Sequence, residues 1–291
     1  MTARSIRLVL CLAVFVAGRP SAGVEPVIQF TDATDAAGLR VPLEGMMGHA
    51  SAWGDIDGDG DLDLYVGGFA DRPDDEYRPA PGPVPNRLFR NDARGRFEPV
   101  TNASVELFGR SAGAVFADLD NDGMLDLYVA NNTRPNSRLP PGVQRDAQLN
   151  RSRLFRNDAG TLVDVSETCV AASGSARSAG VLDYDGDGLL DLLIVEDRFS
   201  PRPARTRLCR NLGNFKFADV TLDAALPKDL FGFGVAIADL NDDSRPDFFV
   251  THSNRLFVSA ANGCCARSRS ISSRSKRACT QAIGGMCLSN R

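Results

Sequence analysis

A nine-residue acidic motif, Asp-x-Asp-x-Asp-Gly-x-x-Asp, recurs along this chain. Three complete copies begin at Asp55, Asp118 and Asp183, and a fourth begins at Asp239 with Ser244 in place of the glycine. Carboxylates this close repel one another unless the segment is solvated or a cation lies among them. A solvated acidic tract has no reason to keep a period of about 60 residues, which is typical of a repeat architecture. The repetition therefore favours a cation at each copy.

The spacing within the motif fits Ca²⁺, which takes six to eight oxygen ligands at about 2.3–2.6 Å. Side chains at positions 1, 3 and 5 of a tight loop converge on one centre, and glycine at position 6 permits the positive φ that turns the backbone inward. A backbone carbonyl near position 7 and the carboxylate at position 9 complete the shell. Mg²⁺ prefers a strict octahedron with retained waters and fits less well.

We therefore expect three strong calcium sites and one weak site. The weak site is the fourth, because Asn241 lacks a charge and Ser244 resists a positive φ. The predicted metal ligands are Asp55, Asp57, Asp59, Asp61 and Asp63; Asp118, Asp120, Asp122 and Asp126; Asp183, Asp185, Asp187 and Asp191; and Asp239, Asn241, Asp243 and Asp247.

The motif is not an EF-hand. That loop needs a glutamate at position 12 and a helix on each side. Position 12 is Val66, Val129, Ile194 or Val250, and each lies in a strand-like run. The acidic loops therefore join strand to strand.

Other segments recur in step with the acidic loops. A small-residue run precedes each loop, as in "HASAWGD" and "SAGAVFAD". Segments such as "NRLFRND" (86–92) and "FADVT" (217–221) follow. Each unit thus predicts four short strands, which is the content of a β-propeller blade. The small residues suit the crowded position near a propeller axis. The fourth unit has three such strands, and one further piece, "FTDAT" (30–34), precedes all the others.

These repeats resemble the FG-GAP/VCBS family of calcium-binding blades. The combination of "FTDAT", "GHASAWGDIDGDGDLDLYV" and "NRLFRND" resembles more narrowly the cartilage acidic protein/ASPIC–UnbV group. The resemblance covers about residues 28–262. It implies an all-β propeller of about seven blades, calcium in the blade loops and an extracellular binding role. This chain has four loops and no ASPIC/UnbV segment, so we expect about four blades. They are either part of a larger propeller, which we favour, or a closed ring in which "FTDAT" completes the last blade.

The two ends differ from the body, residues 24–262, which holds all 37 acidic side chains. Residues 1–23 begin with Arg4 and Arg7, followed by an apolar run and then small residues, as a secretory signal peptide does. Residues 263–291 are basic and hold four of the seven cysteines. We favour an out-of-frame or fragment end for this tail over a genuine extension. We expect a secreted protein, or a periplasmic one if the source is bacterial. We expect no integral membrane segment in the mature chain and no nucleic-acid partner, because the body is acidic.

Two functional classes remain. The first is a non-enzymatic extracellular binding or adhesion scaffold whose partner is a protein or a glycan. The second is a calcium-dependent carbohydrate- or phosphoester-active enzyme, which we disfavour because the chain has two histidines and no Gly-x-Ser-x-Gly motif.

Four further residues are notable. His49 and Arg177 each lie six residues before a loop and are candidate ligand-binding residues in a central channel. Packing within an inner strand is the favoured alternative for both. Cys169 and Cys209 form a disulfide, or Cys209 is a buried thiol in the place that phenylalanine takes in the sister units. Both interpretations stay open.

Overall fold

The computed structural model describes residues 28–101, 104–132, 151–168, 176–197 and 205–260. The chain divides into two units after residue 33. The described part of the first unit, residues 28–33, has no regular secondary structure. The predicted signal peptide, the basic tail and Cys169 lie outside the described residues.

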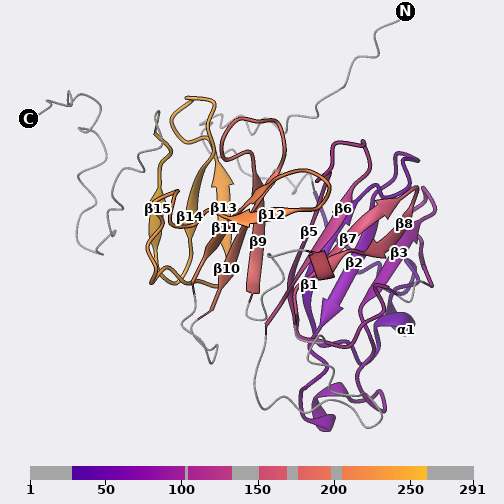
Figure 1. Cartoon of the computed structure of the whole chain (residues 1–291). Helices are drawn as coiled ribbons and strands as arrows, with labels where there is room; N and C mark the ends of the chain where they lie inside the picture. Colours follow the sequence, from indigo (N-terminus) through magenta and orange to yellow (C-terminus); the bar gives the residue numbers. More distant parts are fainter. Residues whose placement is uncertain (1–27, 102–103, 133–150, 169–175, 198–204, 261–291) are drawn as a thin grey trace, which may run out of the picture. The chain divides into compact units, whose positions relative to one another are not determined.

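The second unit is all-β, with four antiparallel sheets whose strands follow one another in chain order (Figure 1). The first sheet contains β1 (Gly48–Gly54), β2 (Asp63–Gly68), β3 (Arg87–Asn91) and β4 (Phe97–Pro99). The second contains β5 (Ser111–Ala117), β6 (Asp126–Asn131), β7 (Arg153–Asp158) and β8 (Thr161–Asp164). The third contains β9 (Ala176–Leu182), β10 (Asp191–Glu196), β11 (Arg207–Asn211) and β12 (Phe217–Asp219). The fourth contains β13 (Val235–Ala238), β14 (Asp247–Val250) and β15 (Arg255–Phe257).

These sheets confirm the predicted strand content of the four units, including three strands in the fourth among the described residues. The helical segments are short. They are α1 (Arg40–Leu43), η1 (Asp74–Tyr77) and η2 (Ser166–Thr168), none of which the repeat pattern predicts. No helix of the described residues is long and apolar enough to cross a membrane.

The first strands of consecutive sheets lie next to one another, β1 beside β5, β5 beside β9, and β9 beside β13. Small residues permit this approach. A Cβ atom on Gly113 would lie 2.9 Å from the backbone oxygen of Arg177, and one on Gly180 would lie 2.5 Å from Ile237. Four-stranded sheets with neighbouring first strands are the blades of a propeller-like fold, as the sequence predicts.

Three apolar clusters fill the spaces between consecutive blades. Between the first and second blades, Ile56 of the acidic loop packs in one cluster with Leu162 of β8. Between the second and third, Leu119 shares a cluster with Phe217 of β12. Fully burying one such side chain contributes about 1.5–3 kcal/mol. The residue at position 2 of each of these loops thus anchors the loop on the following blade.

Cys209 is fully buried in β11, within the cluster between the second and third blades. The registers place it opposite Leu192 in the way that Phe89 lies opposite Leu64 and Phe155 lies opposite Leu127. It therefore occupies a core position of the repeat.

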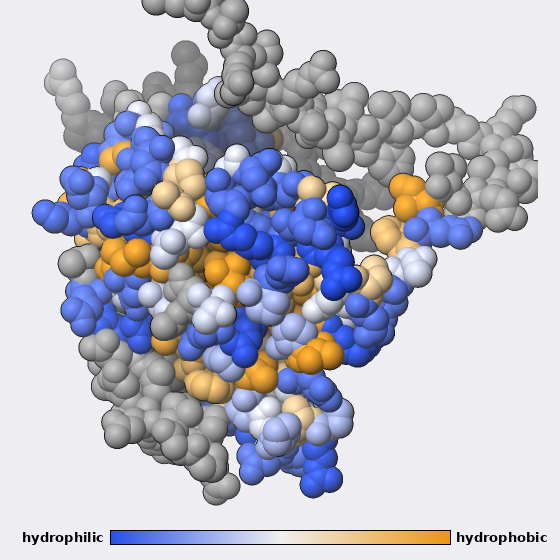
Figure 2. All heavy atoms as spheres, turned by 90° about the vertical axis from the view of Figure 1, so that its right-hand side faces the viewer, coloured by the Kyte–Doolittle hydropathy of each residue, from blue (hydrophilic) through white to orange (hydrophobic). Residues whose placement is uncertain are grey.

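The surface of the molecule is mixed. Figure 2 shows one face that is largely hydrophilic, with separate hydrophobic patches between the polar side chains. The large exposed apolar side chains include Trp53, Leu62 and Val41, which are 54%, 54% and 80% exposed. Scattered apolar residues of this kind are ordinary on a folded protein surface.

Candidate metal centre

Each acidic motif forms the loop of a hairpin between the first and second strands of a blade. The registers pair Gly54 with Asp63 in the first blade and Ala117 with Asp126 in the second. In the same way, Asp191 pairs with Leu182 in the third blade and Asp247 pairs with Ala238 in the fourth. The position-9 aspartate is therefore the first residue of the second strand in every blade, which confirms that the loops join strand to strand.

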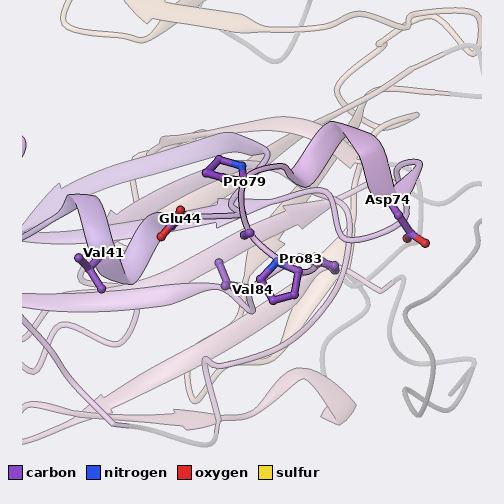
Figure 3. Close-up of a pocket in the computed structure, with 9 residues that line it drawn as sticks. Val41, Glu44, Asp74, Pro79, Pro83 and Val84 are labelled. Atoms are coloured by element: carbon purple, nitrogen blue, oxygen red, sulfur yellow. The ribbon is translucent and has the colours of Figure 1, made fainter.

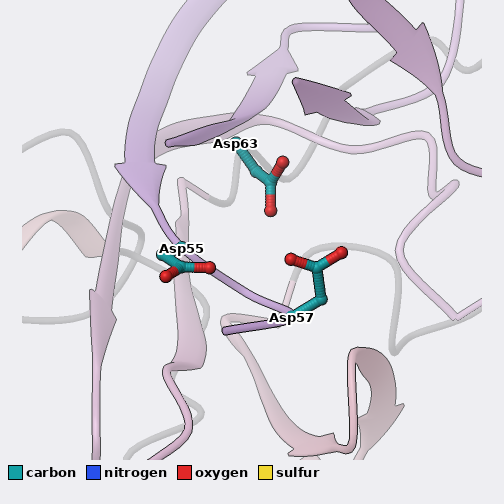
Figure 4. A group of neighbouring side chains, drawn as sticks. All are labelled: Asp55, Asp57 and Asp63. Carbon is teal, nitrogen blue, oxygen red and sulfur yellow. The ribbon is translucent and has the colours of Figure 1, made fainter. Parts of the chain in front are cut away.

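In each of three loops, three carboxylates gather around a common point within that loop. The groups are Asp55, Asp57 and Asp63; Asp118, Asp120 and Asp122; and Asp183, Asp185 and Asp191. Within each group, one carboxylate oxygen per residue lies within 4.8 Å of the others. Figure 4 shows the three carboxylates of the first group facing a common space.

The donor set fits a calcium ion. Two oxygens bound to one Ca²⁺ at about 2.3–2.6 Å cannot lie further apart than about 4.6–5.2 Å. Carboxylate oxygens that lie within 4.8 Å of one another are close enough to share one such ion. Carboxylate oxygens are also the hard ligands that Ca²⁺ prefers. Three side chains leave the remaining positions to backbone carbonyls and water.

The position-1 aspartate shapes its loop through backbone hydrogen bonds. The two carboxylate oxygens of Asp55 accept from the amides of Gly58 and Gly60, at 2.8 and 3.0 Å. Asp183 accepts in the same way from Gly186 and Gly188. These bonds close the loop, so the position-1 side chain has a structural role as well as the predicted metal-binding role.

Two residues of each loop have positive φ. At position 6 the values are 95° for Gly60 and 91° for Gly123, which confirms the prediction for this glycine. Position 4 is left-handed too, with Gly58 at 76° and Asn121 at 60°. Sequence reasoning overlooked position 4, where Gly, Asn and Asp are the residues that tolerate this conformation best.

The position-9 aspartates are buried at the base of their loops. Asp126 is 1% exposed, and its two oxygens accept from the backbone amides of Leu119 and Asn157, at 2.9 and 2.8 Å. Burial raises the pKa of Asp126 to about 7 and that of Asp191 to about 6. Burial of an ionised carboxylate is costly, and a cation beside it would offset that cost.

In each of two blades, an arginine of the third strand faces the carboxylates of that blade's acidic loop. Arg210 forms ion pairs with Asp185 at 2.6 Å and Asp187 at 3.1 Å. Arg90 pairs with Asp57 in the first loop. A hydrogen bond from the backbone of Leu189, followed by the bond from Arg210, lowers the pKa of Asp187. These arginines neutralise part of the loop charge.

An asparagine of the third strand, Asn157 in the second blade and Asn211 in the third, links the acidic loop of the preceding blade to its own blade. Sequence reasoning missed this role. The side-chain amide of Asn211 donates to Leu119 O in the preceding blade at 2.7 Å and to Leu190 O in its own blade at 3.0 Å. Asn157 makes the equivalent pair of bonds one blade earlier. The recurring asparagine of "LFRN" was the available signal, but its partner in the preceding blade lies 101 residues away for Asn157 and 92 for Asn211.

The fourth loop differs from the other three. Its carboxylates form no group of three acidic ligands among the described residues. Asp243 pairs with Arg245 at 2.5 Å and accepts a hydrogen bond from the Asn241 amide at 3.0 Å. Ser244 has a φ of 64°, so the serine adopts the positive φ that it was expected to resist, at a conformational cost. The weaker fourth site stays a prediction that this geometry favours.

Several predicted ligands lie outside the three groups. They are Asp59, Asp61, Asp126, Asp187, Asp239, Asn241, Asp243 and Asp247. Asp59 instead accepts a hydrogen bond from the backbone amide of Asp61 at 2.9 Å. Their ligand role stays a prediction.

His49 and Arg177 both lie near the start of a first strand. The His49 ring stacks on Phe69 at 3.8 Å, and Arg110 covers the same phenylalanine at 4.0 Å. Partial burial, followed by the positive charge of Arg177, lowers the pKa of His49. Arg177 donates to Asp197 at 2.7 Å and lies 5.3 Å from the Phe233 ring. Both residues thus have packing partners, and their ligand-binding role stays a prediction.

A separate pocket of about 590 Å³ lies beside α1 and η1. Glu44 and Asp74 line it together with Val41 and residues 79–84. Figure 3 shows Glu44 and Asp74 at separate places along the pocket, with Pro83 between them.

The comparisons with known proteins agree with this geometry. A sequence profile of the FG-GAP-like repeat matches residues 55–129 and 143–194. The two matched segments contain the first three acidic loops, so this part of the chain is similar to FG-GAP-like repeats. The chain is similar to cartilage acidic protein 1 of Mus musculus, with 26% identity over 232 residues. The match covers 72% of this chain and 33% of that protein, so the chain spans about a third of its relative's length.

Two solved structures share a remote likeness. A rhamnogalacturonan lyase of Bacillus licheniformis has a TM-score of 0.37 and 15% identity, over 69% of this chain and 39% of the lyase. An Agrocybe aegerita lectin that recognises non-reducing terminal N-acetylglucosamine has a TM-score of 0.31 and 17% identity, over 77% of this chain and 66% of the lectin. At these TM-scores neither likeness informs the fold or the function.

Proposed function

We propose that this protein is a secreted, calcium-stabilised scaffold that binds an extracellular protein or glycan and catalyses no reaction. One observation carries the calcium part of this proposal. Three hairpin loops each bring three carboxylates within 4.8 Å of one another. The similarity to cartilage acidic protein 1 over the repeats supports the extracellular scaffold role.

Asp55, Asp118 and Asp183, with their group partners, would hold the three ions. A bound ion supplies positive charge that offsets the repulsion among the carboxylates of its loop. Hydrogen bonds between the chain's own residues supply further stabilisation. Asn157 and Asn211 tie the first two loops to the blades that follow them, so a rigid loop keeps two blades in register.

The residues available for a partner lie at the opposite ends of the same strands. His49 and Arg177 precede their acidic loops by a full strand, and Arg177 lies near Phe233, which is 42% exposed. A guanidinium beside an aromatic face suits an anionic glycan or an acidic protein surface. We assign the partner to this end of the strands because the other end is occupied by the metal loops.

A binding screen tests this proposal. Mature protein is offered to arrays of sulfated and uronate glycans and of matrix proteins, with calcium and with chelator. We expect calcium-dependent binding that falls at least several-fold in Arg177→Gln. Lys216→Gln is the matched control, because it removes a positive charge from the turn before β12 rather than from the start of a first strand. Release of new reducing ends from any glycan would instead support the enzyme class.

A further inference from the structure

One position recurs in all four blades, six residues before the first aspartate of each acidic loop. Its occupants are His49, Ala112, Arg177 and Phe233. In the first three blades, the pairing of the first and second strands steps over this residue, so His49, Ala112 and Arg177 are each the extra residue of a β-bulge. A bulge re-aims its side chain, and bulges are frequent beside binding sites. The four residues form one row along the starts of neighbouring first strands.

Neighbouring members of this row lie close together. The guanidinium carbon of Arg177 lies 5.3 Å from the centre of the Phe233 ring. A Cβ atom on Gly113, beside Ala112, would lie 2.9 Å from the backbone oxygen of Arg177. Ala112 contributes only a methyl group, so no long side chain of the row separates Arg177 from His49. The charge of Arg177 helps to lower the pKa of His49, so the two side chains lie within electrostatic reach of each other.

Arg177 is held in place with donors to spare. Its Nε donates to Asp197 at 2.7 Å, and Asp197, which is 1% exposed, also accepts from the Asn132 amide at 2.6 Å. Among the described residues, the two terminal nitrogens of Arg177 make no hydrogen bond. A guanidinium binds a carboxylate or sulfate through two parallel N–H groups. The buried ion pair thus orients a group that still has donors for an anion.

His49 is exposed and is held by the flat face of its ring. That ring stacks on Phe69, with 3.8 Å between the ring centres and an angle of 15° between the planes. Arg110 lies over the same phenylalanine at 4.0 Å. Neither ring nitrogen of His49 makes a hydrogen bond within the part of the chain that the structure describes. Both nitrogens are therefore available to a ligand.

The net charge around this place depends on His49. The three arginines whose charges act on His49 are each paired with a carboxylate. The pairs are Arg110 with Asp71, Arg72 with Glu76, and Arg177 with Asp197. Each arginine charge is thus balanced by its own partner. Protonation of the imidazole is the step that gives the site a net positive charge.

We propose that an acidic sugar binds over Ala112, with its carboxylate or sulfate group between Arg177 and His49 and its ring beside Phe233, and that binding draws a proton onto His49. This inference rests on the proposed function, whose partner it identifies by chemistry. Phe233 is 42% exposed, and its apolar surface suits the C–H groups of a sugar ring. An acidic side chain of a protein has no such ring. An anion beside His49 favours the imidazolium, so affinity should rise as pH falls.

NMR titration of the mature protein in calcium-containing buffer tests the proposal. The chain has two histidines, so His49→Gln assigns the imidazole signal of His49. Methyl glucuronide is the probe, and methyl glucoside, which lacks the carboxylate, is the matched ligand control. We expect the glucuronide to raise the pKa of His49 and to bind at least about threefold more tightly at about pH 5.5 than at about pH 7.5. The glucoside should do neither.

Variants test the position of the ligand. Arg177→Gln should weaken glucuronide binding at least several-fold, and Ala112→Leu should do the same by filling the space between Arg177 and His49. Lys216→Gln, which removes a positive charge from the turn before β12, should leave the affinity unchanged. His49→Gln should retain part of the affinity, because Arg177 remains, and should lose its dependence on pH. A purely structural role of His49 would leave that dependence in place.

Two results would overturn the proposal. One is a His49 signal that neither methyl glucuronide nor N-acetylglucosamine 6-sulfate moves. The other is a signal that a tetraglutamate peptide moves and these sugars do not, which would assign the site to an acidic protein. Either result together with Arg177-dependent binding in the array screen would leave the scaffold function standing. A glucuronide effect on His49 in a protein that binds nothing in that screen would support this site and contradict the scaffold function.

Discussion

The side-chain amide of Asn157 donates a 2.7 Å hydrogen bond to the backbone carbonyl of Ile56, 101 residues earlier in the chain. The same amide donates to Leu125 O at 3.0 Å. Ile56 lies in the first acidic loop and Leu125 in the second. One buried side chain thus joins two candidate metal loops on neighbouring blades, which couples the order of one loop to that of the other.

Asn157→Ala should therefore destabilise the protein. It removes the amide that donates to two carbonyls and the oxygen that accepts from the Gly160 amide at 2.8 Å, which costs on the order of 1–3 kcal/mol of unfolding free energy. Asn91→Ala is the matched control, because Asn91 has the same blade position but its side chain donates to Leu62 O alone among the described residues. Urea unfolding of both variants measures the difference. Equal losses would contradict the linking role of Asn157.

His49 should make stability depend on pH. Its pKa is lowered in the folded protein, first by burial and then by the charges of Arg177, Arg110 and Arg72. The unfolded chain therefore binds this proton more readily than the folded protein. The contribution of His49 is fully present above its ordinary pKa of 6.5 and is lost as pH falls toward the folded value.

His49→Gln removes this titration. Melting temperatures of wild type and variant, taken at intervals from about pH 7.5 to about pH 5, provide the measurement. We expect the wild type to lose more stability than the variant as pH falls below about 6.5. Parallel pH profiles for the two proteins would contradict the lowered pKa.

The fourth loop should gain a calcium site through two substitutions. Ser244 has a φ of 64°, and a non-glycine residue there costs on the order of 1 kcal/mol. Asn241→Asp adds the missing charge at position 3. Ser244→Gly with Asn241→Asp should raise the calcium count by one, and the double variant should exceed either single one. A double variant that binds no more calcium than wild type would contradict the view that loop chemistry limits this site.

The repeat made much of this architecture predictable. The position-6 glycines and the strand-like runs located the four hairpins, because both follow from local backbone conformation. The ion pairs of Arg90 and Arg210 and the bridges of Asn157 and Asn211 were not predictable in the same way. They join residues that are far apart in the chain or in different blades, and no local pattern encodes such contacts. The helix η1 and the pocket beside it lie in an insertion that the repeat pattern does not contain.

Calcium stoichiometry tests the central claim most directly. Isothermal titration of chelator-treated mature protein should give three ions per chain. Asp57→Asn, Asp120→Asn and Asp185→Asn each remove one charge from one group at constant shape, and each should lower the count by one or weaken one site at least tenfold. A wild-type protein that binds no calcium would contradict the account.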